Sequence, residues 1–493
     1  MPKRATSFSL ILPERDAATP AYRWLYDALR AAILDGRMRP GSRLPATRDL
    51  AAEYGLSRGT IISAFEQLKS EGYVEGSVGS GTYVSKVLPD ELFRVKGKAG
   101  PKQPERQRKG RVLSDYARQA KLFPNYGVRP VRAFRANLPA LDLFPIALWT
   151  QLATRRLRQV TRNLLMGCES MGYDPLRAAI ADYLNTSRGV KCAPDQVVVV
   201  SGVQEALDLA ARLFLNPGDR VCVEEPGYTG AAMVFEAYGA KIRPAPLDQE
   251  GLEVTERTLR GSRLVYVTPG HQFPLGMTMS LSRRLALLDW ARTSGAMIFE
   301  DDYDSEYRYS GRPVPALQGL DPEGPVLFAG SFSKVLFPSL RLGYLVVPRD
   351  MIDIFAAAKS IMNRHGPLLE QTVLCDFIVE GHFGRHLRRM REIYAERLSF
   401  LLTSARQRLA GLLEISEIEA GLQTTGWLGD GIQGVAAEEA AAARGVEVVA
   451  LSRYSRGPLN REGLMLGFAA MDTAEIQRGV EQLGVALEQQ SRI

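Results

Sequence analysis

The stretch Gly330-Ser331-Phe332-Ser333-Lys334 follows Val326–Ala329, a short apolar run that predicts a buried strand. A lysine at such a point lies at the end of a sheet, where a lowered pKa would make its amine a nucleophile for carbonyl groups. The two serine hydroxyls of this stretch and the guanidinium of Arg341 could grip a phosphate. Together these groups indicate pyridoxal phosphate held on Lys334, although a bare Ser-x-x-Lys is more often an ordinary surface lysine.

The length and the charge of the chain predict at least two domains. A chain of 493 residues is too long for one ordinary core. Residues 1–111 hold 20 Lys and Arg against 12 Asp and Glu, so the excess positive charge of the chain lies there and predicts a polyanionic partner. No run is apolar over the roughly 18 residues that a membrane helix needs. The four scattered cysteines are typical of reduced thiols, so we expect a cytoplasmic protein without a membrane partner.

The first hundred residues predict three helices and a hairpin. Apolar positions have a helical period over Tyr22–Leu34, over Thr47–Tyr54 with Thr47 as N-cap, and over Ser57–Glu71, where Ser57 is the cap. Two short runs of β-forming residues then surround the glycine-rich segment Gly76–Gly81. Two helices joined by a short turn containing glycine, followed by a hairpin wing, are typical of a winged helix-turn-helix.

Motifs within this segment are more specific. From Gly36 to Val84 the chain contains Gly-x-x-x-Pro-Gly-x-x-Leu-Pro-x-x-Arg-x-Leu-Ala, Leu-Ser-Arg-x-Thr, Glu-Gly-Tyr-Val and Gly-Ser-Gly-Thr-Tyr-Val, and it resembles the GntR-type winged helix. The resemblance implies a domain over residues 16–86 that binds double-stranded DNA. The residues that it implies on DNA are Arg48, Ser57, Arg58, Thr60 and the wing glycines Gly79 and Gly81. Arg58 could reach a guanine edge in the major groove, whereas Ser57 is equally well a plain N-cap.

The remainder of the chain predicts a linker and an α/β domain. Over residues 87–129, basic residues mixed with Pro and Gly predict a flexible linker. Residues 130–490 alternate apolar runs with helical patterns, which predicts a large, mostly parallel sheet covered on both faces and, from about Gly381, a small C-terminal lobe. The predicted strands are Val197–Val200, Arg220–Val223, Leu264–Val267, Met297–Phe299, Val326–Ala329 and Tyr344–Val347.

Polar and aromatic residues follow several of these strands, at the edge where open α/β sheets bind ligands. Ser201–Gln204 opens a helix whose amides could hold a phosphate, Tyr228 offers an aromatic ring, and Asp301 offers a carboxylate. With Lys334 and Arg341, these are the groups that a pyridinium aldehyde phosphate requires.

In this order, with Lys334 placed 33 residues after Asp301, the residues resemble fold-type I aminotransferases over residues 130–490. The resemblance implies a Schiff base on Lys334, a partner for the pyridine nitrogen in Asp301, a bond from Tyr303 to the ring oxygen, and Tyr228 stacked on the ring. It places the cofactor phosphate among Ser331, Ser333, Arg341, Gly202, Val203 and Gln204. A substrate or effector would meet Arg453, where the family binds a carboxylate, and His271.

The fusion of the two domains is similar to the MocR (GabR-like) subfamily of GntR-type regulators. The strings Glu-Glu-Pro-Gly-Tyr at 224–228, His-Gln-Phe-Pro at 271–274 and Glu-Asp-Asp-Tyr-Asp-Ser-Glu at 300–306 agree with it. The resemblance implies a homodimer whose two winged helices bind two DNA half-sites. It also implies a regulator that senses an amine, an amino acid or a vitamin by aldimine chemistry on Lys334.

Enzymatic activity is a weaker expectation. Where aminotransferases have Asn-Pro-x-Gly, this chain has Phe273-Pro274-Leu275-Gly276, and a phenyl group cannot donate a hydrogen bond to the ring oxygen. We therefore expect a half-transamination at most. The alternatives are an active aminotransferase that converts an amino acid to a 2-oxo acid and carries a DNA-binding module, and a regulator of vitamin B6 synthesis with pyridoxal phosphate as its effector. His382 and His386 have metal-ligand spacing, but arginines crowd them, and we expect no metal.

Overall fold

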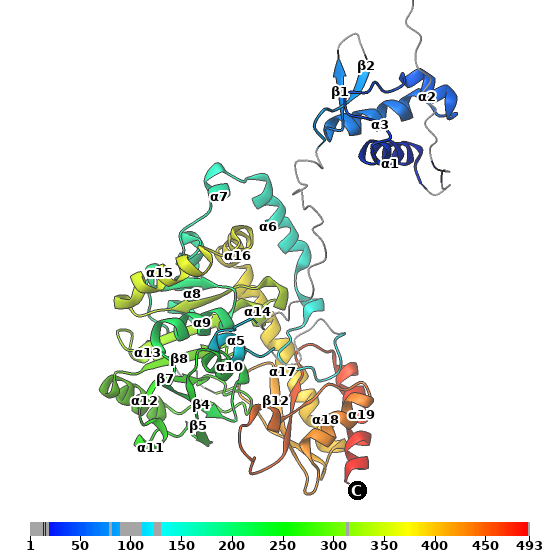
Figure 1. The fold of residues 1–493 in the computed structure, drawn as a ribbon. Helices are drawn as coiled ribbons and strands as arrows, with labels where there is room; N and C mark the ends of the chain where they lie inside the picture. The colour runs from blue at the N-terminus through cyan, green and yellow to red at the C-terminus, as the bar shows by residue number, and fades with distance from the viewer. Residues whose placement is uncertain are drawn as a thin grey trace, which may run out of the picture. The chain divides into compact units, whose positions relative to one another are not determined.

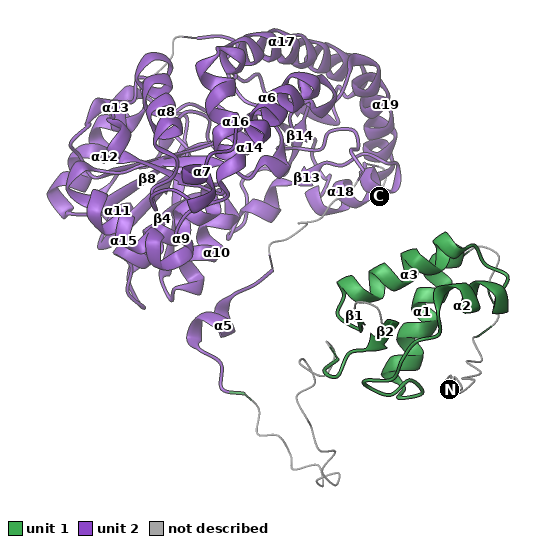
Figure 2. Ribbon diagram, turned by 90° about the horizontal axis from the view of Figure 1, so that it is seen from above, with its two compact units in different colours: residues 1–111 green, residues 112–493 purple. Residues whose placement is uncertain are grey.

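The computed structural model describes Pro13, Arg15 and residues 19–77, 81–88, 111–122, 130–311 and 315–491. These residues form two units, divided after Arg111 and coloured separately in Figure 2. Each unit has its own hydrophobic core, as the change from basic linker to apolar runs along the sequence predicts. Within the described residues, no helix combines the length and the apolar character that crossing a membrane requires.

The first unit is the predicted winged helix. It contains α1 (Ala21–Leu34), α2 (Thr47–Glu53), α3 (Arg58–Ser70), β1 (Val74–Ser77) and β2 (Gly81–Val84). The two strands pair antiparallel, with Val74 opposite Val84. Leu29, Leu50, Ile61 and Leu68 come from the three helices and are fully buried, so apolar burial holds the helices together.

The two predicted N-caps have different outcomes. The Ser57 hydroxyl accepts a hydrogen bond from the Thr60 amide at 3.1 Å, which confirms the cap of α3. The expectation for Thr47 is wrong, because α2 begins at Thr47 itself and Ala46 occupies the N-cap without a side-chain hydrogen bond.

Within its described residues, the predicted linker contains one helix. Helix α5 (Asp115–Gln119) forms because Ser114 caps it, accepting a hydrogen bond from the Ala117 amide at 3.2 Å. The ring of Tyr116 then packs edge-on against Tyr238 at 5.4 Å between centroids. This contact between distant parts of the chain was not visible in the local pattern. Most of the remaining linker lies outside the described residues.

The second unit contains a sheet in the order β3-β10-β9-β8-β7-β4-β5-β6. All six predicted strands are present, and the core of the sheet is parallel; β10 runs antiparallel to both of its neighbours. The strand β5 was missed because Pro244 and Pro246 and its polar residues resemble a loop. The strands are β3 (Val197–Val200), β4 (Arg220–Glu225), β5 (Lys241–Asp248), β6 (Gly251–Leu252), β7 (Ser262–Val267), β8 (Met297–Asp302), β9 (Val326–Ser331) and β10 (Gly343–Val346).

Helices cover both faces of this sheet (Figure 1), which explains its nearly continuous apolar strands. Val198 and Val200 pack with α9, α10 and α15 on one face, whereas Val197 and Val199 pack with α8 and α16 on the other. The bounds are α6 (Ile146–Arg158), α7 (Arg162–Met166), α8 (Asp174–Ser187), α9 (Val203–Phe214), α10 (Thr229–Ala237), α11 (Glu256–Leu259), α12 (Leu281–Ser294), α13 (Leu317–Leu320), α14 (Phe332–Val335), α15 (Ile352–Asn363) and α16 (Leu368–Val379).

A small C-terminal lobe follows, as the change of pattern near Gly381 predicts. Its four-stranded antiparallel sheet has the order β11-β12-β14-β13, and α17 packs against α19. The elements are α17 (His382–Arg408), β11 (Leu413–Ile415), β12 (Gln423–Leu428), α18 (Gly434–Ala443), β13 (Val449–Ala450), β14 (Gly463–Gly467) and α19 (Thr473–Gln490).

One glycine controls how closely the strand ends approach. Gly343, at the start of β10, lies between the ends of β3 and β9. A Cβ atom there would lie 2.7 Å from the Gly330 carbonyl oxygen and 3.3 Å from the Gly202 Cα atom. A side chain would therefore force apart the end of β9 and the backbone that follows β3.

We expect Gly343→Ala to lower the free energy of unfolding by about 1–3 kcal/mol, because the backbone on both sides has no room to yield. The matched control is Gly384→Ala in α17, where an added Cβ atom meets nothing within 4 Å. Its helical position should make that change neutral or stabilising by up to about 1 kcal/mol. Chemical denaturation of both variants measures the difference; equal stabilities would contradict the close approach.

Candidate functional site

Lys334 lies in α14, one short turn after the end of β9, and is partly buried. Burial lowers the pKa of its amine to about 8, with a smaller contribution from the Arg341 charge, while Asp304 and Asp301 oppose this shift. A substantial fraction of the amine is therefore neutral near physiological pH, which is the state that attacks a carbonyl carbon.

Asp301 lies near the end of β8 and is 4 % exposed. Burial raises the pKa of its carboxyl to about 7, against the stabilising hydrogen bond that the Tyr266 hydroxyl donates to Oδ2 at 2.7 Å. Sequence analysis missed Tyr266, which lies in β7 among apolar residues and has the pattern of a core residue. The sequence did offer one indication: a tyrosine on an otherwise apolar, buried strand has a hydroxyl group that needs a hydrogen-bond partner.

Tyr228 immediately precedes α10, and its hydroxyl accepts a hydrogen bond from the Gln204 side chain at 2.9 Å. Gln204 was expected to contribute its backbone amide; the structure adds a role for its side chain. A Cβ atom at Gly230 would lie 2.5 Å from both the Tyr228 ring and the Gln204 amide nitrogen. The glycine thus leaves room for this pair.

Tyr303 and His271 meet in a buried chain of hydrogen bonds. The His271 Nδ1 atom lies 3.0 Å from the Tyr303 hydroxyl and 2.9 Å from Asp304 Oδ1. Asp304 Oδ2 also accepts the Leu422 amide at 3.1 Å, so the carboxylate links this group to the C-terminal lobe. Asp304 was missed as a site residue, although it lies in the quoted string at 300–306. The buried His271 Nε2 atom has no hydrogen-bond partner within the described residues.

The groups expected to hold a phosphate also meet. Gly202 precedes α9, and the amides of Val203 and Gln204 make no hydrogen bond to any described residue. Arg341 has a left-handed backbone (φ 49°, ψ 46°), is exposed, and forms no ion pair within the described part of the chain. A Cβ atom on Gly202 would lie 3.5 Å from the Arg341 guanidinium, so the absence of a side chain keeps space beside it. Two backbone amides and a guanidinium without partners among the described residues are groups that can bind a phosphate.

The two serines of the opening stretch differ in what they contact. Ser331 is the last residue of β9 and is buried. The Ser333 hydroxyl donates to the Leu342 carbonyl oxygen at 3.4 Å, a weak contact with the segment that leads into β10. Ser333 thus has a structural contact besides its predicted place at the phosphate.

Phe273 fills an apolar position between the aromatic residues of the site. It is 5 % exposed, and its ring packs edge-on against Tyr228 at 5.8 Å, Tyr303 at 6.0 Å and Tyr454 at 4.9 Å between centroids. Its side chain offers no hydrogen-bond donor to a ligand at this place.

The remaining predicted residues have other partners. The Arg453 guanidinium forms an ion pair with Glu438 at 3.3 Å; its neighbour Tyr454 is the residue that packs on Phe273. His382 does have a carboxylate nearby, Glu380 at 3.3 Å, which the sequence analysis did not foresee. The ring of His386 instead packs on Phe144, and no group of three metal-ligating side chains occurs among the described residues.

The start of α3 presents the expected DNA-contacting groups. Arg58 is exposed, and Thr60 shares a 2.8 Å hydrogen bond with the Ser57 hydroxyl. Arg48 is also exposed, with its Nε atom 3.4 Å from Asp49. A Cβ atom at Gly81 would lie 2.7 Å from the Arg43 Nε atom, which places a cation against the wing. Gly79 lies outside the described residues.

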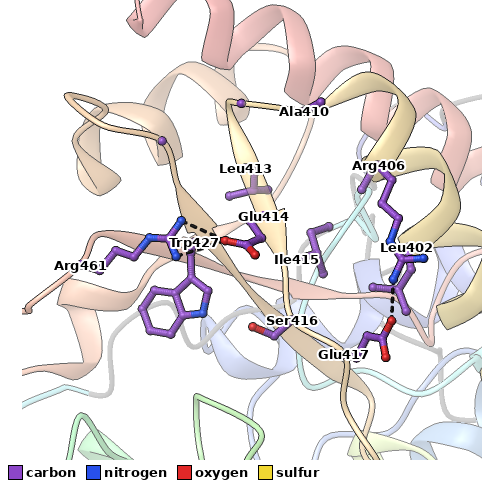
Figure 3. Close-up of a pocket in the computed structure, with 13 residues that line it drawn as sticks. Leu402, Arg406, Ala410, Leu413, Glu414, Ile415, Ser416, Glu417, Trp427 and Arg461 are labelled. Atoms are coloured by element: carbon purple, nitrogen blue, oxygen red, sulfur yellow. Dashed lines mark hydrogen bonds and ion pairs between the residues drawn. The ribbon is translucent and has the colours of Figure 1, made fainter.

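A separate pocket of about 840 Å³ lies in the C-terminal lobe, between the end of α17 and β11 (Figure 3). Its two arginines are already ion-paired: Arg406 with Glu417, and Arg461 with Glu414 at 3.2 Å. Arg461 also lies 5.8 Å from the Trp427 ring centroid. No residue of the predicted cofactor site lines this pocket.

The chain is similar to regulators over nearly its whole length. Residues 21–84 match the family of bacterial regulatory proteins, gntR family, and residues 141–483 match aminotransferase class I and II. The chain is 40 % identical to the probable rhizopine catabolism regulatory protein MocR of Rhizobium meliloti, over 96 % of this chain and 95 % of that protein. It is 30 % identical to the pyridoxine biosynthesis transcriptional regulator PdxR of Corynebacterium glutamicum, over 91 % and 92 %.

The second unit is also similar to solved aminotransferase structures. Pyrococcus horikoshii kynurenine aminotransferase, solved with PMP, aligns with a TM-score of 0.67 at 28 % identity, covering 73 % of this chain and 91 % of that one. Together with Lys334, Asp301 and Arg341, which lie within electrostatic reach of one another, this similarity supports pyridoxal phosphate as the cofactor. The chain belongs to the MocR subfamily of GntR-type transcription regulators, in which a DNA-binding winged helix precedes a fold-type I aminotransferase-like domain.

Proposed function

We propose that this regulator detects an amine, an amino acid or a vitamin at Lys334 and changes its contact with DNA in response. The observation that carries the proposal is a lysine amine of lowered pKa that interacts electrostatically with Asp301 and with an arginine lacking an ion-pair partner in the described chain. Bound pyridoxal phosphate supplies an aldehyde carbon that condenses with amines. Lys334 and an effector amine compete for that carbon, so effector binding changes what the lysine contacts.

Each neighbouring residue has a distinct task in this proposal. The Asp301 carboxylate, held by a hydrogen bond from Tyr266, would keep a pyridine nitrogen protonated. Tyr303, fixed by His271 and Asp304, would donate its hydroxyl to the ring oxygen, and Tyr228 would cover the ring face. The phosphate contacts are Arg341, Ser331, Ser333 and the backbone of Gly202, Val203 and Gln204.

An effector carboxylate is the proposed ligand of Arg453. Its half-exposed guanidinium would exchange Glu438 for the effector. The next residue, Tyr454, packs on Phe273, and the Tyr454 carbonyl oxygen accepts a hydrogen bond from the Gly227 amide at 3.0 Å. A shift of Arg453 and Tyr454 would therefore be transmitted to Tyr228, which follows Gly227, and to a cofactor ring beside it.

Phe273 favours sensing over repeated turnover. Phe273, whose phenyl ring packs against three tyrosine rings, has no side-chain hydrogen bond that it could donate to a bound cofactor. A second candidate function is regulation of vitamin B6 synthesis with pyridoxal phosphate itself as the effector. The observation that favours it is 30 % identity with a regulator named for pyridoxine biosynthesis.

The proposed assembly is a cytoplasmic homodimer whose two winged helices bind two half-sites of double-stranded DNA. Arg58 and Arg48, exposed at α3 and α2, would contact the DNA together with Ser57, Thr60 and the wing. Dimers with this symmetry bind operators whose half-sites repeat with the same symmetry.

DNA binding with and without effector tests the proposal. We expect an amine or amino acid to change the affinity of the wild-type protein for DNA from its own promoter region, and to leave the affinity of Lys334→Ala unchanged. Fluorescence anisotropy across an amine panel measures both. A response to pyridoxal phosphate alone would favour the second candidate function. Sustained formation of a 2-oxo acid would instead show an enzyme.

The attachment of the cofactor to Lys334 should follow the pKa of the lysine. Only the neutral amine reacts, so the rate at which apoprotein acquires the visible absorbance of lysine-bound cofactor should rise with pH and level off above about 8. Asp301 raises the pKa of Lys334, so Asp301→Asn should move this profile to lower pH. Stopped-flow absorbance measures both profiles, with Lys334→Ala as the blank. If the rate levels off only near the ordinary pKa of a lysine, the burial of Lys334 does not lower the pKa of its amine, and this prediction is wrong.

Arg58→Ala should weaken DNA binding by about 1–3 kcal/mol if its guanidinium contacts a base. The matched control is Arg37→Ala, another exposed arginine of the same unit, which forms an ion pair with Asp35 at 3.4 Å. Because this exposed ion pair is weak, Arg37→Ala should weaken DNA binding by no more than about 1 kcal/mol. Titration of one operator at several salt concentrations separates base contact from phosphate contact. Equal losses in the two variants would remove Arg58 from the recognition surface.

A further inference from the structure

A buried lysine on α15 contacts the first turn of α9, although α15 carries none of the predicted site residues. Lys359, in α15, is 1 % exposed, and its Nζ atom is ion-paired with Glu205 Oε1. Asn363, one turn later in α15, donates to the same carboxylate oxygen at 3.1 Å and accepts from Lys359 at 3.2 Å. Two side chains of α15 thus hold one carboxylate of α9.

Glu205 is the third residue of α9, and its other oxygen has a second task. Oε2 accepts the Ser201 amide at 2.7 Å, which closes the turn through Gly202 between β3 and the helix. This turn positions the amides of Val203 and Gln204. The carboxylate therefore orders the backbone that is proposed to receive the cofactor phosphate.

The same carboxylate creates an electrostatic conflict. Burial acts to raise the pKa of Glu205, but the Lys359 charge and the Ser201 hydrogen bond outweigh burial and hold it below its ordinary value. Glu205 is therefore negative at neutral pH, in the first turn of the helix that would bind a phosphate. Two anions near one helix N-terminus, with little solvent to screen them, repel unless a cation compensates one of them.

We infer that Lys359 is a positioning residue for the cofactor phosphate: it neutralises Glu205, so that this carboxylate can order the Ser201–Gly202 turn without repelling the phosphate. The inference rests on the placement of the phosphate at the start of α9 under the proposed function. Lys359 does not contact the cofactor in this arrangement. It acts through Glu205, and α15 becomes part of the phosphate site.

The test compares pyridoxal 5′-phosphate with pyridoxal, which lacks the phosphate. Phosphate selectivity is the ratio of the dissociation constant of pyridoxal to that of pyridoxal 5′-phosphate, measured on the full-length apoprotein by fluorescence quenching. Lys359→Met keeps an unbranched side chain but removes the charge, and it should lower the selectivity by about tenfold. Glu205→Gln should raise the selectivity, because Lys359 is then uncompensated and the amide oxygen can still accept the Ser201 amide.

The double variant Glu205→Gln/Lys359→Met should return to within about threefold of the wild-type selectivity, since both charges are absent. If Lys359→Met weakens both ligands equally, the ion pair is only structural and the inference is wrong. If Lys359→Met fails to fold, Glu205→Gln decides: a selectivity that does not rise overturns the inference.

Arg341→Met separates this inference from the proposed function. It should lower phosphate selectivity through direct loss of a phosphate contact. If Arg341→Met leaves the selectivity unchanged, the phosphate lies elsewhere and the proposed placement fails. If Arg341→Met lowers it and Lys359→Met does not, only the role of Lys359 is refuted.

Discussion

The structure of the second unit depends on how closely three backbone segments approach at Gly343. Because this residue has no side chain, β10 fits between the ends of β3 and β9. The end of β3 leads into the turn at Gly202, and the end of β9 leads to Lys334. The same close approach therefore brings a helix N-terminus and a reactive lysine to one edge of the sheet, where a cofactor would meet both.

Charges buried at this edge are mutually compensated, and their pKa values show how. Burial disfavours the ammonium of Lys334 and the carboxylate of Asp301, and the attraction between them opposes both shifts. Tyr266 adds a hydrogen bond to Asp301, and Lys359 compensates Glu205 at the phosphate end. Each charge needs a nearby partner because an isolated buried charge would cost far more than the fold can supply. The result is a site whose groups are ordered before a ligand arrives.

The pattern of functional groups agrees with a receptor built on an enzyme fold. A lysine, a carboxylate and an arginine lie together on an aminotransferase-like fold, while Phe273 fills its place beside Tyr228 and Tyr303 with a ring that has no hydrogen-bond donor. Arg453 forms an ion pair with Glu438 at the surface, and its neighbour Tyr454 packs on Phe273 in the site. A ligand that displaces Glu438 can thereby change the packing around the aromatic residues. Under the proposed function, the winged helix is the surface whose DNA contact responds to such a change.

Sequence alone determined the domain order, the six principal strands and the winged helix, and it predicted the residues Lys334, Asp301 and Arg341, which the structure brings within electrostatic reach of one another. These follow from local patterns, because apolar periodicity specifies an element and a motif specifies which residues follow it. It did not show β5, whose prolines hide it, or the packing of Tyr116 in α5 against Tyr238, which lies far away in the sequence. Tyr266, Asp304 and the Lys359–Glu205 pair also came only from the tertiary structure. Each of them acts through a contact between segments far apart in the chain, and the packing of those segments decides which buried charge finds which partner.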